Sequence, residues 1–210
     1  HPNRRGFDHF TGFRGGWSDY HRWRLDRDGR RMDADGRYLT DVLTDEAIGF
    51  IRKYKQDPFF LHLTYNAPHT PLQAPETEVR RFMEAGRVSY PVAVLYGMIA
   101  RLDECLGRVL DTLDAEGLSR DTIVLFTSDN GPQFESEIGS LERFNCDFAG
   151  RKGRVYEGGI RVPAAIRWPA GLPGGVDHHH LVHFTDWLPT LAGLCGVDTG
   201  TCRPLDGQDL

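Results

Sequence analysis

The 210-residue sequence predicts an α/β fold in which helices cover a buried, parallel β-sheet. Two observations support this class. Short apolar runs typical of buried strands alternate with longer segments whose apolar residues recur at helical spacing. Two of the strand-like runs end in loops rich in turn-forming residues, which is where α/β proteins gather their functional groups.

The first half of the chain contains one predicted helix and one predicted strand. Residues 1–38 show no clean period, and we interpret them as irregular surface structure. Residues 38–54 are predicted to be helical, because their apolar side chains recur at helical spacing at Leu43, Ala47, Phe50, Ile51 and Tyr54. The run DPFFLHLTY at 57–65 predicts a buried strand, and the proline-punctuated NAPHTPLQAP at 66–75 predicts a loop.

The strongest helical pattern covers residues 92–118, and Gly117 is its expected C-terminal stop. Cys105 falls on the apolar face of this helix and is expected to be a buried thiol. That face is formed by Leu95, Met98, Ile99, Leu102, Leu106, Val109, Leu110 and Leu113.

Two further strands and a short helix are predicted after this helix. The strands are TIVLFTS at 122–128 and AAIRW at 164–168. The helix lies within 185–196, with Thr185 or Asp186 as its N-cap.

Composition excludes some classes of partner and site. A formal net charge of −5 gives a nucleic-acid partner no electrostatic support. The longest apolar runs are too short to span a bilayer. No cysteine pair has zinc-site spacing, and Cys195 and Cys202 could close a small loop, although spacing alone does not establish a disulfide. The run His178–His180 is interpreted as a loop, because consecutive side chains diverge.

The stretch TSDNGP places two oxygen donors, Asp129 and Asn130, at the end of a predicted strand. Gly131 and Pro132 supply the turn that could aim both side chains at one point. An all-oxygen pair suits a hard cation such as Ca²⁺ or Mg²⁺. The alternative is an Asx-turn in which both residues cap their own backbone, and two ligands do not complete a cation site.

Two other loops carry candidate catalytic side chains. His69 lies between prolines in YNAPHTP, where a fixed imidazole could protonate a leaving group or bind an anion. Lys152 lies in GRKGRVYEGG, whose cations favour a bound oxyanion. Taken singly, each is also compatible with an ordinary surface position. The lysine loop lacks the order of a Walker phosphate loop, which excludes that nucleotide motif.

Together these segments resemble the type I sulfatase family, nearly from end to end. The matching stretches, in chain order, are RGFDHFTGF, PFFLHLTYNAPHTPLQAP, TIVLFTSDNGP, GRKGRVYEGGIRVP, DWLPTL and LDGQDL. Each motif alone is modest, but their joint order is specific.

The resemblance implies an alkaline-phosphatase-like α/β sheet covered by helices and incomplete at its N-terminus. Residues 1–210 would be the central to C-terminal part of one sulfatase catalytic domain, with about 203–210 starting the link to a smaller C-terminal subdomain. It implies a divalent cation, usually Ca²⁺, on Asp129 and Asn130, and contacts from His69 and Lys152 to a small-molecule or saccharide sulfate ester.

The family nucleophile is a formylglycine made from Cys or Ser in a C/S-x-P-x-R motif, and no stretch here fits it. CRPLD at Cys202 and SYPVA at Ser89 have Asp206 and Ala93 in place of the arginine. We therefore expect the motif upstream of this chain, an inactive isolated fragment, and a formylglycine-generating or sulfatase-maturating enzyme as partner. The resemblance suggests a periplasmic, extracellular or lysosomal location.

Two alternatives stay open from the sequence. One is a phosphonate or phosphodiester hydrolase on the same scaffold. The other is a non-catalytic protein that binds sulfated glycans, which an upstream C/S-x-P-x-R motif would eliminate.

Overall fold

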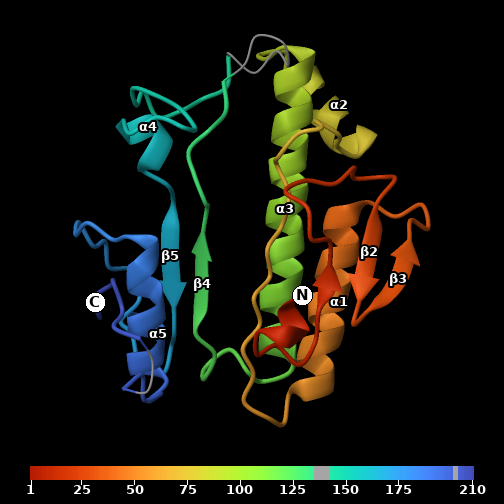
Figure 1. Cartoon of the computed structure of the whole chain (residues 1–210). Coiled ribbons are helices and arrows are strands. Elements are labelled where there is room, and N and C mark those ends of the chain that lie inside the picture. The colour runs from red at the N-terminus through yellow and green to blue at the C-terminus, as the bar shows by residue number, and fades with distance from the viewer. Residues whose placement is uncertain (135–141, 201–202) are drawn as a thin grey trace. The chain divides into compact units, whose positions relative to one another are not determined.

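The computed structural model describes residues 1–134, 142–200 and 203–210. The chain divides into two compact units, His1–Leu172 and Pro173–Leu210. Figure 1 labels their helices and strands. Each unit is described by itself.

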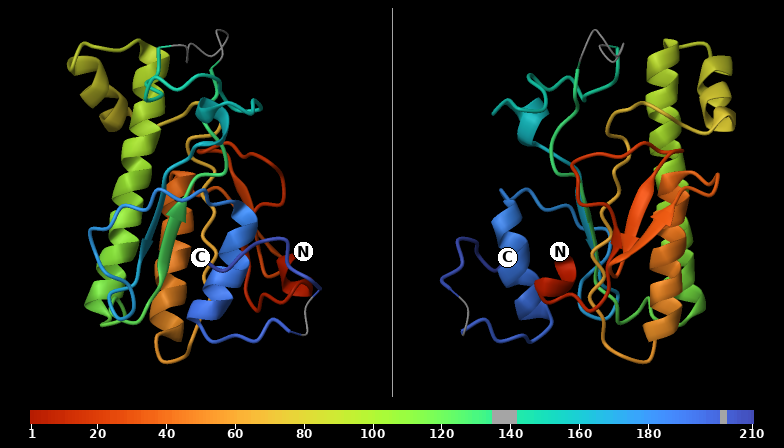
Figure 2. Two further views of the ribbon diagram at one scale, coloured as in Figure 1. Left: turned by 90° about the vertical axis from the view of Figure 1, so that its left-hand side faces the viewer. Right: turned by 45° about the vertical axis from the view of Figure 1, so that its right-hand side comes forward.

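Two long helices form the centre of the first unit. Helix α1 (Leu39–Tyr54) and helix α3 (Tyr90–Ala115) pack side by side, as Figures 1 and 2 show, and both were predicted. Helix α2 (Glu76–Glu84) packs on α3 and was not predicted, because Val79 is its only buried residue. The main buried cluster contains Tyr20, Trp23, Leu25, Tyr38, Leu39, Val42, Leu43, Ala67, Val79, Ala93, Val94 and Met98.

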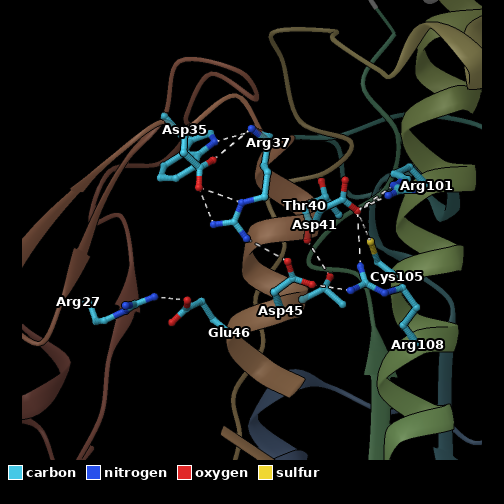
Figure 3. A network of polar contacts seen from close by, with 12 residues as sticks. Arg27, Asp35, Arg37, Thr40, Asp41, Asp45, Glu46, Arg101, Cys105 and Arg108 are labelled. Atoms are coloured by element: carbon cyan, nitrogen blue, oxygen red, sulfur yellow. Dashed lines mark hydrogen bonds and ion pairs between the residues drawn. The ribbon is translucent and has the colours of Figure 1, made fainter. Parts of the chain in front are cut away.

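A network of polar contacts joins α1 to α3 (Figure 3). Arg101 lies 2.6 Å from the Asp41 carboxylate, and Arg108 pairs with Asp45. The thiol of Cys105 donates to Asp41 Oδ1 at 3.3 Å. Cys105 is fully buried, as predicted, and burial raises the pKa of its thiol. This thiol is therefore a packing group of the helix pair.

Helix α3 ends at the predicted glycine. Gly117 has φ +71°, a conformation that favours glycine, and Leu118 N donates to Leu113 O at 2.8 Å. Gly117 N donates to Asp114 O at 3.1 Å, which completes a Schellman motif.

The prediction that residues 1–38 are irregular was wrong in part. They contain an antiparallel sheet in the order β1 (Thr11–Gly12), β2 (Arg24–Arg27) and β3 (Arg30–Asp33). Asp28 and Gly29 make the turn between β2 and β3, with φ of 50° and 83°. The Asp-Gly pair is a hairpin signal in the sequence. The sequence analysis did not use this signal, and each of the two strands carries only one large apolar residue.

The predicted strand at 57–65 is extended, but no described strand pairs with it. Its side chains alternate in burial. Phe59, Leu61 and Leu63 pack against a buried cluster of α1 and α3 side chains, whereas Phe60 and His62 are exposed. The segment is thus half-buried on one face, and the prediction of a buried strand was wrong for the described residues.

Strands β4 (Val124–Thr127) and β5 (Ala164–Arg167) confirm the two other strand predictions. They pair antiparallel, with Val124 opposite Arg167. All described strand pairs are antiparallel, so the expected parallel pairing is not found among them. The chain reverses between β4 and β5 through a long loop that contains the short helix α4 (Glu157–Ile160).

The second unit is built on the predicted C-terminal helix. A 3-10 turn, η2 (Phe184–Asp186), leads into α5 (Trp187–Leu194). Asp186 is the N-cap residue of α5, but its buried carboxylate accepts from the backbone N of His183 (2.7 Å) and of Gln208 (2.9 Å). This clamp holds the chain end against α5.

Cys195 carries a free thiol, and Cys202 lies outside the described residues. None of the described helices combines the length and apolarity that a bilayer crossing requires.

Candidate functional site

The strand-end loop (128–132) and the lysine loop (150–159) are joined through their main chains. After β4, Gly131 N donates to Gly159 O at 3.0 Å. Lys152 N donates to Pro132 O at 2.9 Å. The first bond ties Gly131 to helix α4, and the second ties Pro132 to Lys152. The structure therefore brings three predicted site residues, Asp129, Asn130 and Lys152, onto one backbone framework.

Three glycines permit this close approach. A Cβ on Gly131 would lie 1.9 Å from Gly158 O. A Cβ on Gly158 would lie 2.5 Å from Gly150 O, and one on Gly159 would lie 2.0 Å from Arg154 O. Real Cβ atoms essentially never approach backbone below 3.0 Å. The glycines in DNGP and EGG are therefore required by packing of main chain on main chain.

The side chains of the strand-end loop are available to a ligand. Asp129 is exposed and Asn130 is half-buried. Within the described parts of the chain, no hydrogen bond or ion pair uses either side chain. The hydroxyl of Ser128 makes the local turn bond instead, donating to Asn130 O at 3.1 Å. An Asx-turn by Asp129 or Asn130 is thus not found in the described structure, and both oxygen donors face no protein partner there.

The lysine loop is braced by an asparagine that the sequence reasoning missed. Asn145 Nδ2 donates to Phe148 O at 3.0 Å and lies 3.4 Å from Gly150 O. Arg151 donates to Phe134 O, which ties the loop back to the strand-end segment. Lys152 is exposed, and its ammonium has no ion pair among the described residues. The loop therefore fixes its backbone while leaving the Lys152 ammonium without an ion pair among the described residues.

His69 is exposed at the tip of a loop whose flanking bonds Ala67–Pro68 and Thr70–Pro71 are cis. Its Nδ1 lies 2.8 Å from Thr70 O. A carbonyl oxygen only accepts, so Nδ1 carries a proton. The tautomer is thus set, and Nε2 is the ring nitrogen left to face a substrate.

The histidine loop is held by buried groups that lie far away in the sequence. Its own turn closes through His69 N, which donates to Asn66 O at 2.7 Å. The hydroxyl of Tyr20 lies 2.9 Å from both Asn66 O and His69 O. Tyr20 is completely buried, and burial raises the pKa of its phenol, so it stays a donor at physiological pH.

The described residues bring together only part of the predicted site. No hydrogen bond or ion pair within them joins His69 to Asp129, Asn130 or Lys152. Across the described ranges, no group of three or more His, Cys, Asp or Glu side chains could hold a metal ion. The His178–His180 run lies exposed in coil, as the loop interpretation expected. A complete cation site requires oxygen ligands beyond the two at the strand end.

Comparison with known proteins gives one consistent result. A family model described as Sulfatase matches residues 2–197. The chain is 34% identical to the uncharacterized sulfatase YdeN of Escherichia coli over 215 aligned positions, which cover 100% of this chain and 37% of that protein. It is 38% identical to mouse steryl-sulfatase over 177 positions, covering 82% of this chain and 27% of that protein.

The likeness extends to three dimensions. The crystal structure of Ps i-CgsB in complex with k-i-k-neocarrahexaose matches with a TM-score of 0.89 and 32% identity, covering 100% of this chain and 50% of that one. The family model and this structure confirm the predicted alkaline-phosphatase-like α/β fold. The chain spans about a third of the length of the curated relatives and half of the solved structure.

Proposed function

The chain belongs to the sulfatase family, and from this premise we propose that the whole protein hydrolyses sulfate monoesters. The observation that carries the proposal is the bond from Lys152 N to Pro132 O. This main-chain bond supports the proposal because it ties the residue that carries the cation to the loop of Asp129 and Asn130, whose side chains have no partner in the described structure. A sulfuryl group keeps negative charge throughout cleavage, and a fixed cation beside it stabilises the transition state.

Lys152 and His69 take different roles in this proposal. Lys152 binds a sulfuryl oxygen through its exposed ammonium. His69 protonates the leaving oxygen from Nε2, because Nδ1 donates to Thr70 O and is not available. The imidazole must be protonated at the start of this step. After it gives up the proton, the neutral ring keeps the Nδ1–H tautomer that Thr70 O already favours.

Asp129 and Asn130 fit a hard divalent cation, which we propose to be Ca²⁺, with Mg²⁺ as the alternative. A carboxylate and an amide oxygen at one strand end match the all-oxygen ligand sets of these ions. When bound, the cation would neutralise charge on the sulfate ester. The remaining ligands would come from residues outside those described.

The nucleophile in this proposal is a formylglycine outside residues 1–210, because no C/S-x-P-x-R motif occurs within them. A maturation enzyme that makes formylglycine would then act on the whole protein. Residues 1–210 would form the central to C-terminal part of one catalytic domain, and about 203–210 would begin its link to a smaller subdomain.

A saccharide sulfate ester is the substrate class that we propose first. The support is the neighbour Ps i-CgsB, whose structure holds k-i-k-neocarrahexaose and matches the full chain with a TM-score of 0.89. A steryl sulfate is the second class, because the chain is also 38% identical to mouse steryl-sulfatase.

The test compares wild type, Lys152→Ala and His69→Ala in the whole protein, co-expressed with a maturation enzyme. Substrates are a sulfated oligosaccharide, an aryl sulfate and an aryl phosphodiester. Each variant should lower kcat/KM for sulfate esters by roughly 10²-fold. The matched controls Lys53→Ala and His179→Ala should retain activity. Hydrolysis of the phosphodiester alone would refute the sulfatase proposal, and near wild-type turnover by both variants would refute the residue roles.

A further inference from the structure

Tyr20 is a buried side chain that the proposed chemistry does not use directly. It has no exposed surface, yet its hydroxyl reaches the main chain of the histidine loop at two points. The oxygen lies 2.9 Å from Asn66 O and 2.9 Å from His69 O. One phenolic proton is therefore shared between the two carbonyl groups that open and close the turn before the imidazole.

Tyr20 is itself firmly held. Gln73 Oε1 accepts from Tyr20 N at 2.9 Å, and Gln73 Nε2 donates to Asp19 Oδ2 at 2.9 Å. The hydroxyl of Tyr38 donates to Gln73 O at 2.8 Å, and the two tyrosine rings stack with centroids 5.2 Å apart. The phenol therefore acts from a fixed position in the core.

The direction of the imidazole depends on this support. The hydrogen bond of the His69 ring is to the carbonyl of its own neighbour, Thr70, at 2.8 Å. The ring thus follows the backbone of residues 66–70. Among the described residues, the only side-chain donor from outside the loop to the Asn66 and His69 carbonyls is the Tyr20 hydroxyl.

We propose that Tyr20 is a positioning residue that aims His69 Nε2 at the leaving oxygen of the substrate. The expected change in kcat rests on the proposed function, whereas the expected change in the orientation of the His69 ring does not. Loss of the hydroxyl leaves His69 O without this donor and leaves Asn66 O with only the bond from His69 N, so the turn that carries the imidazole is held less firmly. Displacement of about 1 Å at a reacting group can lower a rate by about 10²-fold.

The experiment compares Tyr20→Phe with Tyr65→Phe in the whole protein. Both variants keep the ring and lose one paired hydroxyl, but the Tyr65 hydroxyl contacts Thr44 Oγ1 at 2.8 Å and not the His69 turn. Tyr20→Phe should lower kcat for a sulfate ester by roughly ten- to a hundredfold with little change in KM, because an interaction made in the transition state is misaligned. Tyr65→Phe should retain most of kcat.

A double-mutant cycle separates positioning from general destabilisation. In a His69→Ala background, Tyr20→Phe should have no further effect on kcat. An equal loss of kcat in both backgrounds would overturn the proposal. If Tyr20→Phe does not fold, Gln73→Met is the second variant, because it removes the side-chain oxygen that accepts from Tyr20 N. It should lower kcat in the wild-type background and have no effect in the His69→Ala background. An unchanged kcat in Gln73→Met would also overturn the proposal.

A spectroscopic readout keeps the two proposals distinguishable. The ring nitrogens of His69, followed by NMR in the whole protein at a pH at which the ring is neutral, should show one Nδ1–H tautomer in the wild type and tautomer averaging in Tyr20→Phe. Absence of sulfate ester hydrolysis with this spectral change would refute the proposed function and keep the positioning role. Identical His69 spectra in wild type and Tyr20→Phe would refute the positioning role whatever the activity.

Discussion

Gly131→Ala tests whether the close approach of the two loops matters for the site. The added Cβ would meet Gly158 O at 1.9 Å, Gly158 C at 2.8 Å and Gly159 Cα at 3.0 Å. These are all backbone atoms, so no side-chain rotation relieves the clash. The φ of Gly131 lies outside the left-handed region that favours glycine. The main perturbation is therefore the clash, which separates the strand-end loop from the lysine loop.

The size of the effect follows from the geometry. The loops must move apart by at least about 1.1 Å before the worst contact reaches the 3.0 Å limit. That movement lengthens the bond from Gly131 N to Gly159 O and weakens the adjacent bond from Lys152 N to Pro132 O, which are now 3.0 and 2.9 Å. A displacement of this order at a catalytic group costs about 10²-fold in rate, or about 2.7 kcal/mol in activation free energy.

The assay measures kcat/KM for a sulfate ester and amide hydrogen exchange at Lys152 in the whole protein. Both should change in Gly131→Ala, with kcat/KM falling about 10²-fold. Gly107→Ala is the matched control, because a Cβ there meets nothing within 4 Å on helix α3. It should keep full activity and stabilise the helix by about 0.5–1 kcal/mol. Unchanged exchange at Lys152 in Gly131→Ala would refute the reasoning.

Two further predictions concern stability. Hydrogen bonds from Gln208 N and His183 N to the Asp186 carboxylate lower its pKa, so the stabilisation it gives is present above the ordinary pKa near 4 and is lost as pH falls through the lower folded value. The protection factor of the Gln208 amide, which is corrected for the intrinsic pH dependence of exchange, should therefore fall below about pH 4 in the wild type, and it should not change over that range in Asp186→Asn. Asp41→Asn should lower the free energy of unfolding by about 2 kcal/mol, because it leaves the partly buried Arg101 without its main partner. The control is Glu76→Gln, which breaks the exposed ion pair with Arg80 and should lower the free energy of unfolding by about 0.5 kcal/mol or less. Urea denaturation measures both losses, and equal losses in the two variants would contradict the prediction.

The long helices α1 and α3 were predictable because their signals are local. Helix α3 carries an apolar face along its 26 residues and a glycine at its C-terminal end, and both are visible without tertiary information. The short strands β2 and β3 carry one apolar side chain each, Leu25 and Met32, so period alone could not identify them. The extended run at 58–65 has the composition of a buried strand, but pairing depends on neighbours and is not encoded in the run itself.

In the candidate site, too, residues with local sequence signals were predicted and residues that depend on tertiary contacts were not. The motifs identified Asp129, Asn130, Lys152 and His69, because each lies in a loop with distinctive turn residues. The groups that hold those loops were not identified. Tyr20 acts on the histidine loop from 46 and 49 residues away, and nothing in the local pattern around it indicates a partner. Such supports come from tertiary packing, which a single sequence does not display.

The two halves of the site are stabilised by different kinds of contact, and this difference determines how each responds to substitution. The strand-end and lysine loops meet mainly through main-chain bonds between glycine-rich segments, with a side-chain bond from Arg151 to Phe134 O, so their approach depends most on Gly131, Gly158 and Gly159. The histidine loop instead depends on one phenol that reaches it from the core. A single substitution at Tyr20 therefore removes the hydrogen bonds from this phenol and leaves the loop with weaker or local bonds, such as the turn bond from His69 N to Asn66 O. Among the candidate site residues, His69, the proposed proton donor, is thus the one whose geometry depends most on a residue outside its own loop.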